Sequence, residues 1–205
     1  MWHTALHMYL GHLVALIYSP QVFVFLIQKY LGVEATALFG FLRNLYGQIS
    51  RYLPATLLFS LIRPKLIASY LGKGGMAELT LNANFVGKLS LFVLMPLLLF
   101  TWLSGDELLR LLSGGKFTQA GYYLTALMMA LIPSSQRQIL ETVAVAARQS
   151  HFCFWGNLLG LATLPLAYGL LESGQGLWSP IVALILGEML FNATLVVAMS
   201  YTTAY

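Results

Sequence analysis

Apolar runs of membrane-spanning length recur along the chain, separated by short stretches rich in glycine, serine and charge. A helix needs about 20 apolar residues to cross the hydrocarbon core of a bilayer. Six runs meet this requirement, near residues 10–29, 35–62, 85–103, 120–147, 152–171 and 178–201. The segments between them, such as LGKGGMAE and ESGQG, are typical of interfacial turns. The pattern therefore predicts an all-α integral membrane protein, a single bundle of about six transmembrane helices over residues 1–205.

Prolines interrupt most of these runs, at positions 20, 54, 96, 133 and 165. Membrane helices tolerate interior prolines because neighbouring helices and side chains can satisfy the freed carbonyl groups. We therefore interpret these prolines as lying within the spans.

Composition supports a membrane environment. The 205 residues are 59% hydrophobic and only 9% charged, and the mean hydropathy is +0.76. Soluble domains carry about 25% charged residues, so this chain has too little polar surface to cover a large soluble core. The net charge of +4 is spread along the chain without a basic cluster, which argues against a nucleic-acid partner. The single cysteine, Cys153, excludes an internal disulfide.

The orientation follows from lysine and arginine in the connections. Six spans place both termini on one side of the membrane, together with Arg63, Lys65, Lys73 and Arg148. The opposite side receives Lys29, Arg110 and Lys116. Under the positive-inside rule, both termini lie in the cytoplasm of a multi-pass protein. The first ten residues contain no Lys or Arg, so we treat the first run as a span rather than a signal peptide.

Two arginines lie within the second predicted span. At about 1.5 Å per residue from Glu34, Arg43 lies roughly 13 Å deep and Arg51 roughly 25 Å deep. Asn44, Gln48 and Arg51 share one helical row, and Arg43 belongs to the adjacent row. Such a polar stripe must face protein or a water-filled cavity rather than lipid.

Later spans carry comparable polar residues, and together they predict a bundle around a hydrophilic cavity. The candidate substrate-binding residues are Arg43, Asn44, Gln48, Arg51, Lys88, Arg137, Glu141, Glu188 and Asn192. Glu188 is expected to face the bundle, near Lys88 or Arg51. Two structural interpretations stay open. Arg51 and Lys88 could mark helix ends, with their charges in the headgroups, and Arg137 with Glu141 could form an i, i+4 structural pair.

The chain offers no catalytic or metal-binding constellation. Its one aspartate, Asp106, lies in a predicted connection, whereas diphosphate-processing membrane enzymes tend to use aspartate clusters. The His3–His7 pair has no carboxylate or cysteine nearby in sequence to complete a metal site. We expect a protein that is not an enzyme and needs no cofactor.

The order of features resembles a known family. The stretches QKYLGVEATALFGFLRNL, RYLPATLLFSLIRPKLIASY, NANFVGKLSLFVLMPLLLF, LLRLLSGGKFTQAGYYL and IPSSQRQILETVAVAARQ cover most of residues 28–149. Together they resemble the polysaccharide transporter branch of the multidrug/oligosaccharidyl-lipid/polysaccharide exporter superfamily. Members have twelve or more helices in two bundles, and this chain looks like the second bundle, the C-terminal half.

The resemblance implies a flippase of the bacterial inner membrane. Its partners would be membrane lipid, an undecaprenyl-diphosphate-linked oligosaccharide for O-antigen or polysaccharide synthesis, and a second six-helix bundle. Basic cavity residues, above all Arg43, would hold the diphosphate. Three alternatives remain: an ion-coupled multidrug exporter, a non-transporting membrane assembly subunit, and an envelope glycan ligase or polymerase.

Overall fold

The chain forms only helices in the part that the structure, a computed structural model, describes: residues 2–57, 64, 65, 67, 68, 70 and 75–203. The helices are α1 (Trp2–Ile17), α2 (Pro20–Tyr52), α3 (Pro54–Leu57), α5 (Gly75–Leu112), α6 (Gly121–Met129), α7 (Leu131–Ala146), α8 (His151–Gly160), α9 (Thr163–Glu172) and α10 (Trp178–Thr203). The all-α prediction is confirmed for these residues.

Four helical stretches are long and apolar enough to cross a membrane. They are Tyr9–Tyr52, Gly75–Leu112, His151–Glu172 and Trp178–Thr202. Large apolar side chains cover their outer surfaces; Phe92 and Leu111, for example, are 76% and 79% exposed. Soluble proteins rarely leave such continuous apolar surface in water. These features are those of a helical membrane protein.

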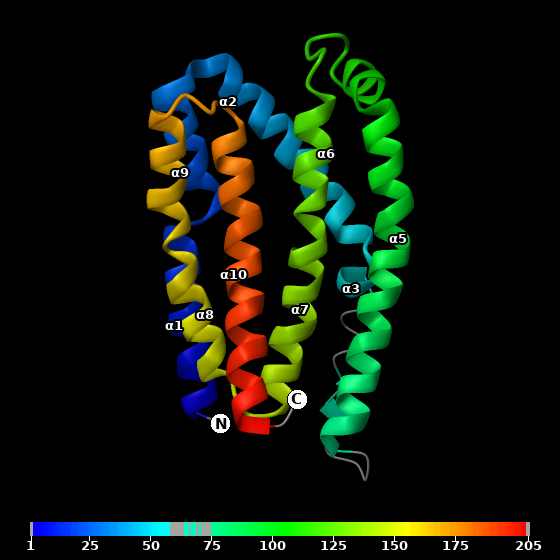
Figure 1. Cartoon of the computed structure of the whole chain (residues 1–205), viewed down its shortest axis with the longest axis vertical. Helices are drawn as coiled ribbons and strands as arrows, with labels where there is room; N and C mark the ends of the chain where they lie inside the picture. The colour runs from blue at the N-terminus through cyan, green and yellow to red at the C-terminus, as the bar shows by residue number, and fades with distance from the viewer. Residues whose placement is uncertain (1, 58–63, 66, 69, 71–74, 204–205) are drawn as a thin grey trace.

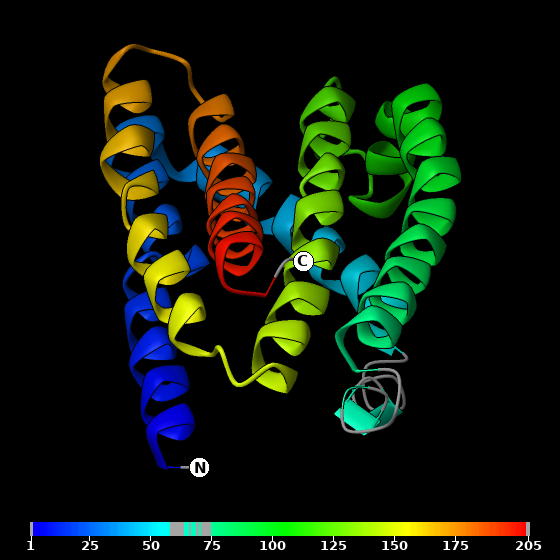
Figure 2. The ribbon, with the colours of Figure 1, turned by 60° about the horizontal axis from the view of Figure 1, so that its bottom comes forward.

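The helices form a bundle in which chain-distant segments lie side by side (Figures 1 and 2). α1 packs against α8, α10 packs against both α8 and α7, and α7 and α6 pack against α5. α2 rises beside α9, bends at Gly32 and then descends behind the other helices towards α6 and α3 (Figure 1). Gly32 has φ 84° and ψ −173°, a conformation open to glycine but costly for residues with a Cβ. The first and last helices have their outer ends at the same end of the molecule (Figure 1).

Two prolines begin helices, and Pro20 still lies within one of the candidate membrane spans. α1 ends at Ile17, and Pro20 opens α2 after the extended residue Ser19. Pro54 likewise opens α3 after Leu53. Proline suits the first turn because its missing N–H would have no intrahelical acceptor there. The run near 10–29 is therefore two helical segments, and the described part of the run near 35–62 breaks at Leu53.

The later prolines lie within continuous helical stretches. Pro133 and Pro165 are the third residues of α7 and α9, where the backbone N–H is still unpaired in a helix. The residues between the paired segments, Ala130 and Leu161–Ala162, keep right-handed helical dihedral angles, and His151–Glu172 forms one candidate membrane span. Pro96 lies within α5, which continues through it from Gly75 to Leu112.

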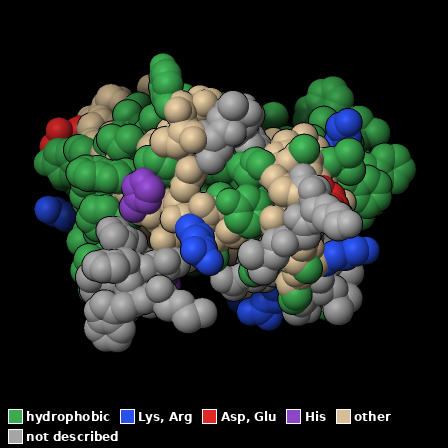
Figure 3. Space-filling view, turned by 90° about the horizontal axis from the view of Figure 1, so that it is seen from below, with side chains coloured by type: hydrophobic (Ala, Val, Ile, Leu, Met, Phe, Trp, Pro, Cys, Tyr) green, Lys and Arg blue, Asp and Glu red, His purple; other side chains and the backbone are tan. Residues whose placement is uncertain are grey.

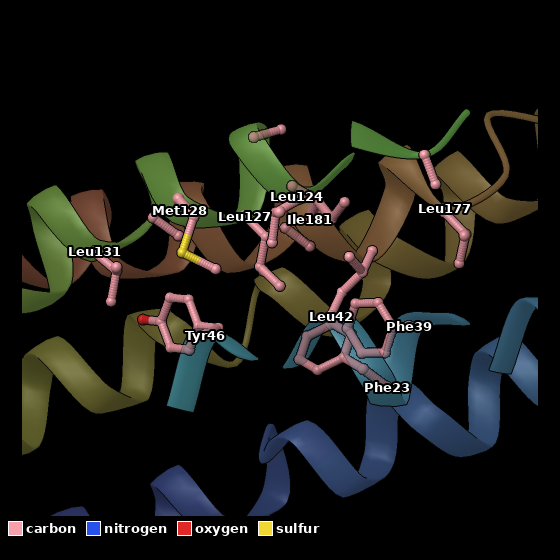
Figure 4. Close-up of a cluster of buried hydrophobic side chains, with 14 of the residues drawn as sticks. Phe23, Phe39, Leu42, Tyr46, Leu124, Leu127, Met128, Leu131, Leu177 and Ile181 are labelled. Carbon is pink, nitrogen blue, oxygen red and sulfur yellow. The ribbon is translucent and has the colours of Figure 1, made fainter. Parts of the chain in front are cut away.

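A layer of apolar side chains joins α2 to the helices in front of it. Phe23, Phe39, Leu42 and Tyr46 of α2 point towards Leu124, Leu127 and Met128 of α6, Leu131 of α7 and Ile181 of α10 (Figure 4). All of these side chains are buried. A second cluster, which includes Leu79, Val143, Cys153 and Phe191, packs α5, α7, α8 and α10 together nearer the chain ends.

α5 and α6 approach each other closely at Gly121. The Asp106 carboxylate accepts a hydrogen bond of 2.7 Å from the Gly121 N–H and so caps the first turn of α6. A Cβ at Gly121 would lie 2.6 Å from the Asp106 backbone nitrogen and 2.8 Å from the Gly105 carbonyl carbon. Because these neighbours are backbone atoms, no side-chain rotation can relieve the overlap.

Gly121→Ala is therefore expected to destabilise the bundle, with a loss of about 1–3 kcal/mol from forced backbone movement. The measurement is the apparent Tm of the detergent-purified protein. Gly169→Ala is the matched control, because α9 leaves open space around Gly169 and alanine favours a helix by up to about 1 kcal/mol. Equal Tm values for the two variants would contradict the close packing of α5 on α6.

Candidate functional site

A pocket of about 210 Å³ lies where α1, α2, α7, α9 and α10 meet. It adjoins two helix breaks, because Tyr18 and Ser19 follow the end of α1 and Thr163 begins α9. The charged residues that line it are Arg43, Arg137 and Glu188; His12 also lies in the wall. The pocket therefore unites candidates from three separate predicted spans.

Arg137 is the centre of a polar network beside this pocket. Its Nε lies 3.0 Å from Glu141 Oε1, and its Nη1 lies 3.5 Å from Glu188 Oε2. Its Nη2 donates to Asn157 Oδ1 at 2.6 Å, and that oxygen also accepts a bond of 2.8 Å from the Tyr18 hydroxyl. The guanidinium carbon lies 3.9 Å from the Phe191 ring centroid. The network joins α7, α8, α10 and the end of α1.

The i, i+4 pairing of Arg137 with Glu141 agrees with the structural interpretation of that pair. The expectation for Glu188 was half right. Its side chain faces the bundle, as predicted, but its basic partner is Arg137 rather than Lys88 or Arg51. Sequence spacing could not select this partner, because the two residues are 51 positions apart and on different helices.

Arg43 enters the same pocket from α2 without a carboxylate of its own. No carboxylate oxygen lies within 4.0 Å of it in the described residues, where the ion pairs belong to Arg137. Its guanidinium carbon lies 4.6 Å from the Tyr46 ring centroid, a cation–π contact. Glu141 and Glu188 both contact Arg137, so Arg43 is a second positive charge beside two carboxylates and has no ion pair of its own among the described residues.

The neighbouring polar row of α2 does not enter the pocket. Asn44, Gln48 and Arg51 are exposed on the outer face of α2, away from the other described helices. Gly40 and Gly47 extend this face, and a Cβ at either glycine would meet nothing within 4 Å. The structure thus separates Arg43 from the row that adjoins it in sequence, and a cavity-lining role for Asn44, Gln48 and Arg51 stays a prediction.

Two further candidates lie elsewhere. Lys88 lines a separate groove between α5 and α7, together with Asn84. Asn192 Nδ2 donates a hydrogen bond of 2.8 Å to the Pro133 carbonyl oxygen, which links α10 to α7. Asn192 is therefore a helix-packing residue in this structure.

Sequence reasoning missed three residues of the site: His12, Tyr18 and Asn157. The available signal for Tyr18 was its position directly before Ser19 and Pro20, where a helix could end and expose a hydroxyl. The available signal for Asn157 was its polar amide side chain within the otherwise apolar run near residues 152–171. No local pattern distinguished His12, which joins the wall only because α1 packs on α8.

Comparison of the chain with protein-family profiles, with curated proteins and with solved structures finds no match. The chemistry of the pocket is consequently the basis for a functional conclusion.

Proposed function

We propose that this chain is one half of a flippase that moves an undecaprenyl-diphosphate-linked oligosaccharide across the bacterial inner membrane. The observation that carries the proposal is the guanidinium of Arg43, which lines a pocket inside a membrane-type bundle and has no ion pair among the described residues. An ionised group at such a position is costly unless it has a function or a partner. An anionic cargo would supply the partner.

The chemistry of arginine fits a diphosphate better than it fits a neutral sugar. Its planar fork binds two phosphate oxygens at once and stays charged at every physiological pH. Arg137 is suited to a supporting role, because its charge is already shared with Glu141 and Glu188. The two arginines would therefore have different roles. Arg43 would bind the diphosphate of the cargo, and Arg137 would stabilise the packing of the helices around the pocket.

The outer face of α2 favours a half-transporter. Asn44, Gln48 and Arg51 would be costly against lipid tails, so this face needs a protein or aqueous neighbour. Transporters of this type form their cargo pathway between two bundles. We propose that a second six-helix bundle faces α2, and that Asn44, Gln48 and Arg51 contact it.

The proposed topology has six crossings. α1 with the first part of α2 makes one, the rest of α2 begins the second, α5 makes the third, and α6–α7, α8–α9 and α10 make the others. Both chain ends would be cytoplasmic; the end of the molecule where they lie bears several Lys and Arg side chains (Figure 3). The turns that follow α5 and α9 lie at the opposite end (Figure 1).

Cysteine labelling tests this topology. Lys116→Cys and Gln175→Cys are expected to react with a membrane-impermeant maleimide in intact spheroplasts. Arg148→Cys should react only after the membrane is opened. The native thiol, Cys153, is buried and provides a low background. Labelling of all three positions from one side would refute the six-crossing arrangement.

The half-transporter hypothesis has its own test. Expression of this chain alone in a strain that lacks its lipid-linked glycan flippase should leave surface glycan absent. Co-expression with the matching second bundle should restore it, and a photo-crosslinking residue at Gln48 should then capture that bundle. Restored export by the chain as a verified monomer would contradict the need for a second half.

A second function, an ion-coupled exporter, is favoured by the Glu188 carboxylate in the pocket wall. A carboxylate that exchanges partners could bind a proton or a cation during transport. Drug efflux distinguishes the two functions. An exporter should support efflux that Glu188→Gln abolishes when compared at equal membrane abundance, whereas the proposed flippase should support no efflux with either residue.

A further inference from the structure

A second hollow lies on a different side of the bundle from the Arg43 pocket. It is a groove between α5, α7 and α10 with a volume of about 340 Å³, and an adjoining hollow of about 480 Å³ continues along α5. Asn84 and Lys88 line both parts. α7 lies between α10 and α5 (Figure 1), and its residues Gln136, Ile139 and Leu140 line the groove. We call this surface the lateral groove.

The lateral groove has one polar region and long apolar walls. Lys88, Asn84 and Gln136 supply an ammonium and two amides, whereas Leu91, Leu140 and Val196 are apolar. Leu81 and Phe85 border the continuation along α5 and are 68% and 65% exposed. A bound molecule that satisfied both regions would have a polar head and hydrocarbon chains.

Lys88 lies at the boundary of the apolar part of α5. Residues 89–105 contain no charged side chain, whereas the preceding turns contain Thr80, Asn82 and Asn84. Lysine at such a boundary extends its ammonium to the headgroup level. The ammonium has no carboxylate within 4.0 Å in the described residues, and it is the only charged group that lines either part of the groove.

We propose that the lateral groove binds an anionic phospholipid, with its phosphate at Lys88 and its acyl chains along α5 and α7. One ammonium matches the single negative charge of a phosphodiester such as phosphatidylglycerol. The amides of Asn84 and Gln136 can donate to the remaining headgroup oxygens. The lipid would bridge α5 and α7 beside Gly87 and Ile139, which line the groove. This site is independent of the Arg43 pocket and of the proposed transport activity.

Native mass spectrometry of the full-length protein in mild detergent tests the site. The probes are phosphatidylglycerol and phosphatidylcholine with identical acyl chains. The wild-type protein should bind phosphatidylglycerol about fivefold more tightly, the preference that one near-surface lysine provides. Lys88→Gln should remove the preference and Lys88→Arg should keep it. Arg110→Gln, which removes an exposed charge from the other end of α5, is the matched control and should change nothing.

A second variant tests the walls of the groove without altering its charge. Val196→Trp should fill the space between α10 and α7 and reduce phosphatidylglycerol binding, even if Lys88→Gln fails to accumulate. Glycerol 3-phosphate, the headgroup without chains, should not displace the lipid. The proposal is overturned by equal binding of the two lipids, by an unchanged preference in Lys88→Gln, by undiminished phosphatidylglycerol binding in Val196→Trp, or by displacement with glycerol 3-phosphate. It is also overturned if a photo-crosslinker at Phe85 captures a protein helix instead of a lipid.

Discussion

Arg43→Ala is expected to abolish glycan export while the protein still accumulates in the membrane. The guanidinium would bind the diphosphate in a partly enclosed pocket, where truncation of one partner of a hydrogen-bonded charge pair costs about 2–5 kcal/mol. That corresponds to a loss of at least about 30-fold in cargo affinity. Insertion should be unaffected, because Arg43 has no ion pair to other described helices. The measurement compares surface glycan with membrane abundance in the same cells.

Two further variants separate a cargo site from a packing role. Arg43→Lys should retain part of the export, because the charge survives while the two-pronged geometry is lost. Arg51→Ala, on the exposed outer face of α2, should have a milder effect because other bases near that end can substitute. If Arg43 only packs on Tyr46, alanine should instead lower the protein level, and lysine should do little better. Normal export from a well-expressed Arg43→Ala protein would end the anion-site proposal.

The helical class was predictable from the sequence, whereas the helix boundaries were only partly so. Apolar runs report burial in lipid or protein, and every described run of that kind is helical. Proline was the ambiguous signal. A proline such as Pro96 can continue within a helix, and one such as Pro20 can start a new helix. The difference depends on what satisfies the adjacent backbone groups, and tertiary neighbours decide that.

The sequence identified several polar residues of the site, but it did not predict which of them face the bundle or contact one another. Helical spacing correctly separated the row of Arg43 from the row of Gln48, yet it could not show which row faces the bundle. The bend at Gly32 sets that orientation, because it directs the second half of α2 across α6 and α3. Similarly, nothing local distinguishes Lys88 from Arg137 as a partner for Glu188. The packing of α10 between α7 and α8 makes that choice.

Arg137→Met is expected to be the most destabilising change at the site. It would leave Glu141, Glu188 and Asn157 without their shared donor, in the centre of the helix contacts. Removal of one member of a fully buried ion pair typically costs about 3–5 kcal/mol, and the loss here should be smaller because the two carboxylate side chains are 22% and 33% exposed. The apparent Tm in detergent and the membrane abundance should both fall. Arg110→Met, which removes an exposed guanidinium from α5, serves as the control and should change neither.

A double variant shows whether the loss comes from the network or from packing alone. In Arg137→Met/Glu188→Gln, the carboxylate of residue 188, the less exposed of the two left without Arg137, is replaced by a neutral amide. The Glu141 side chain is 33% exposed, so its carboxylate can be hydrated. The double variant should therefore be more stable than Arg137→Met, although Glu188→Gln alone destabilises the wild-type protein. Additive losses would mean that the two residues act independently and that the 3.5 Å contact contributes nothing measurable. If the double variant is more stable than the sum of the two single losses predicts, and still exports glycan, Arg137 has the structural role of joining α7, α8 and α10. Arg43 would then be the arginine that binds the cargo.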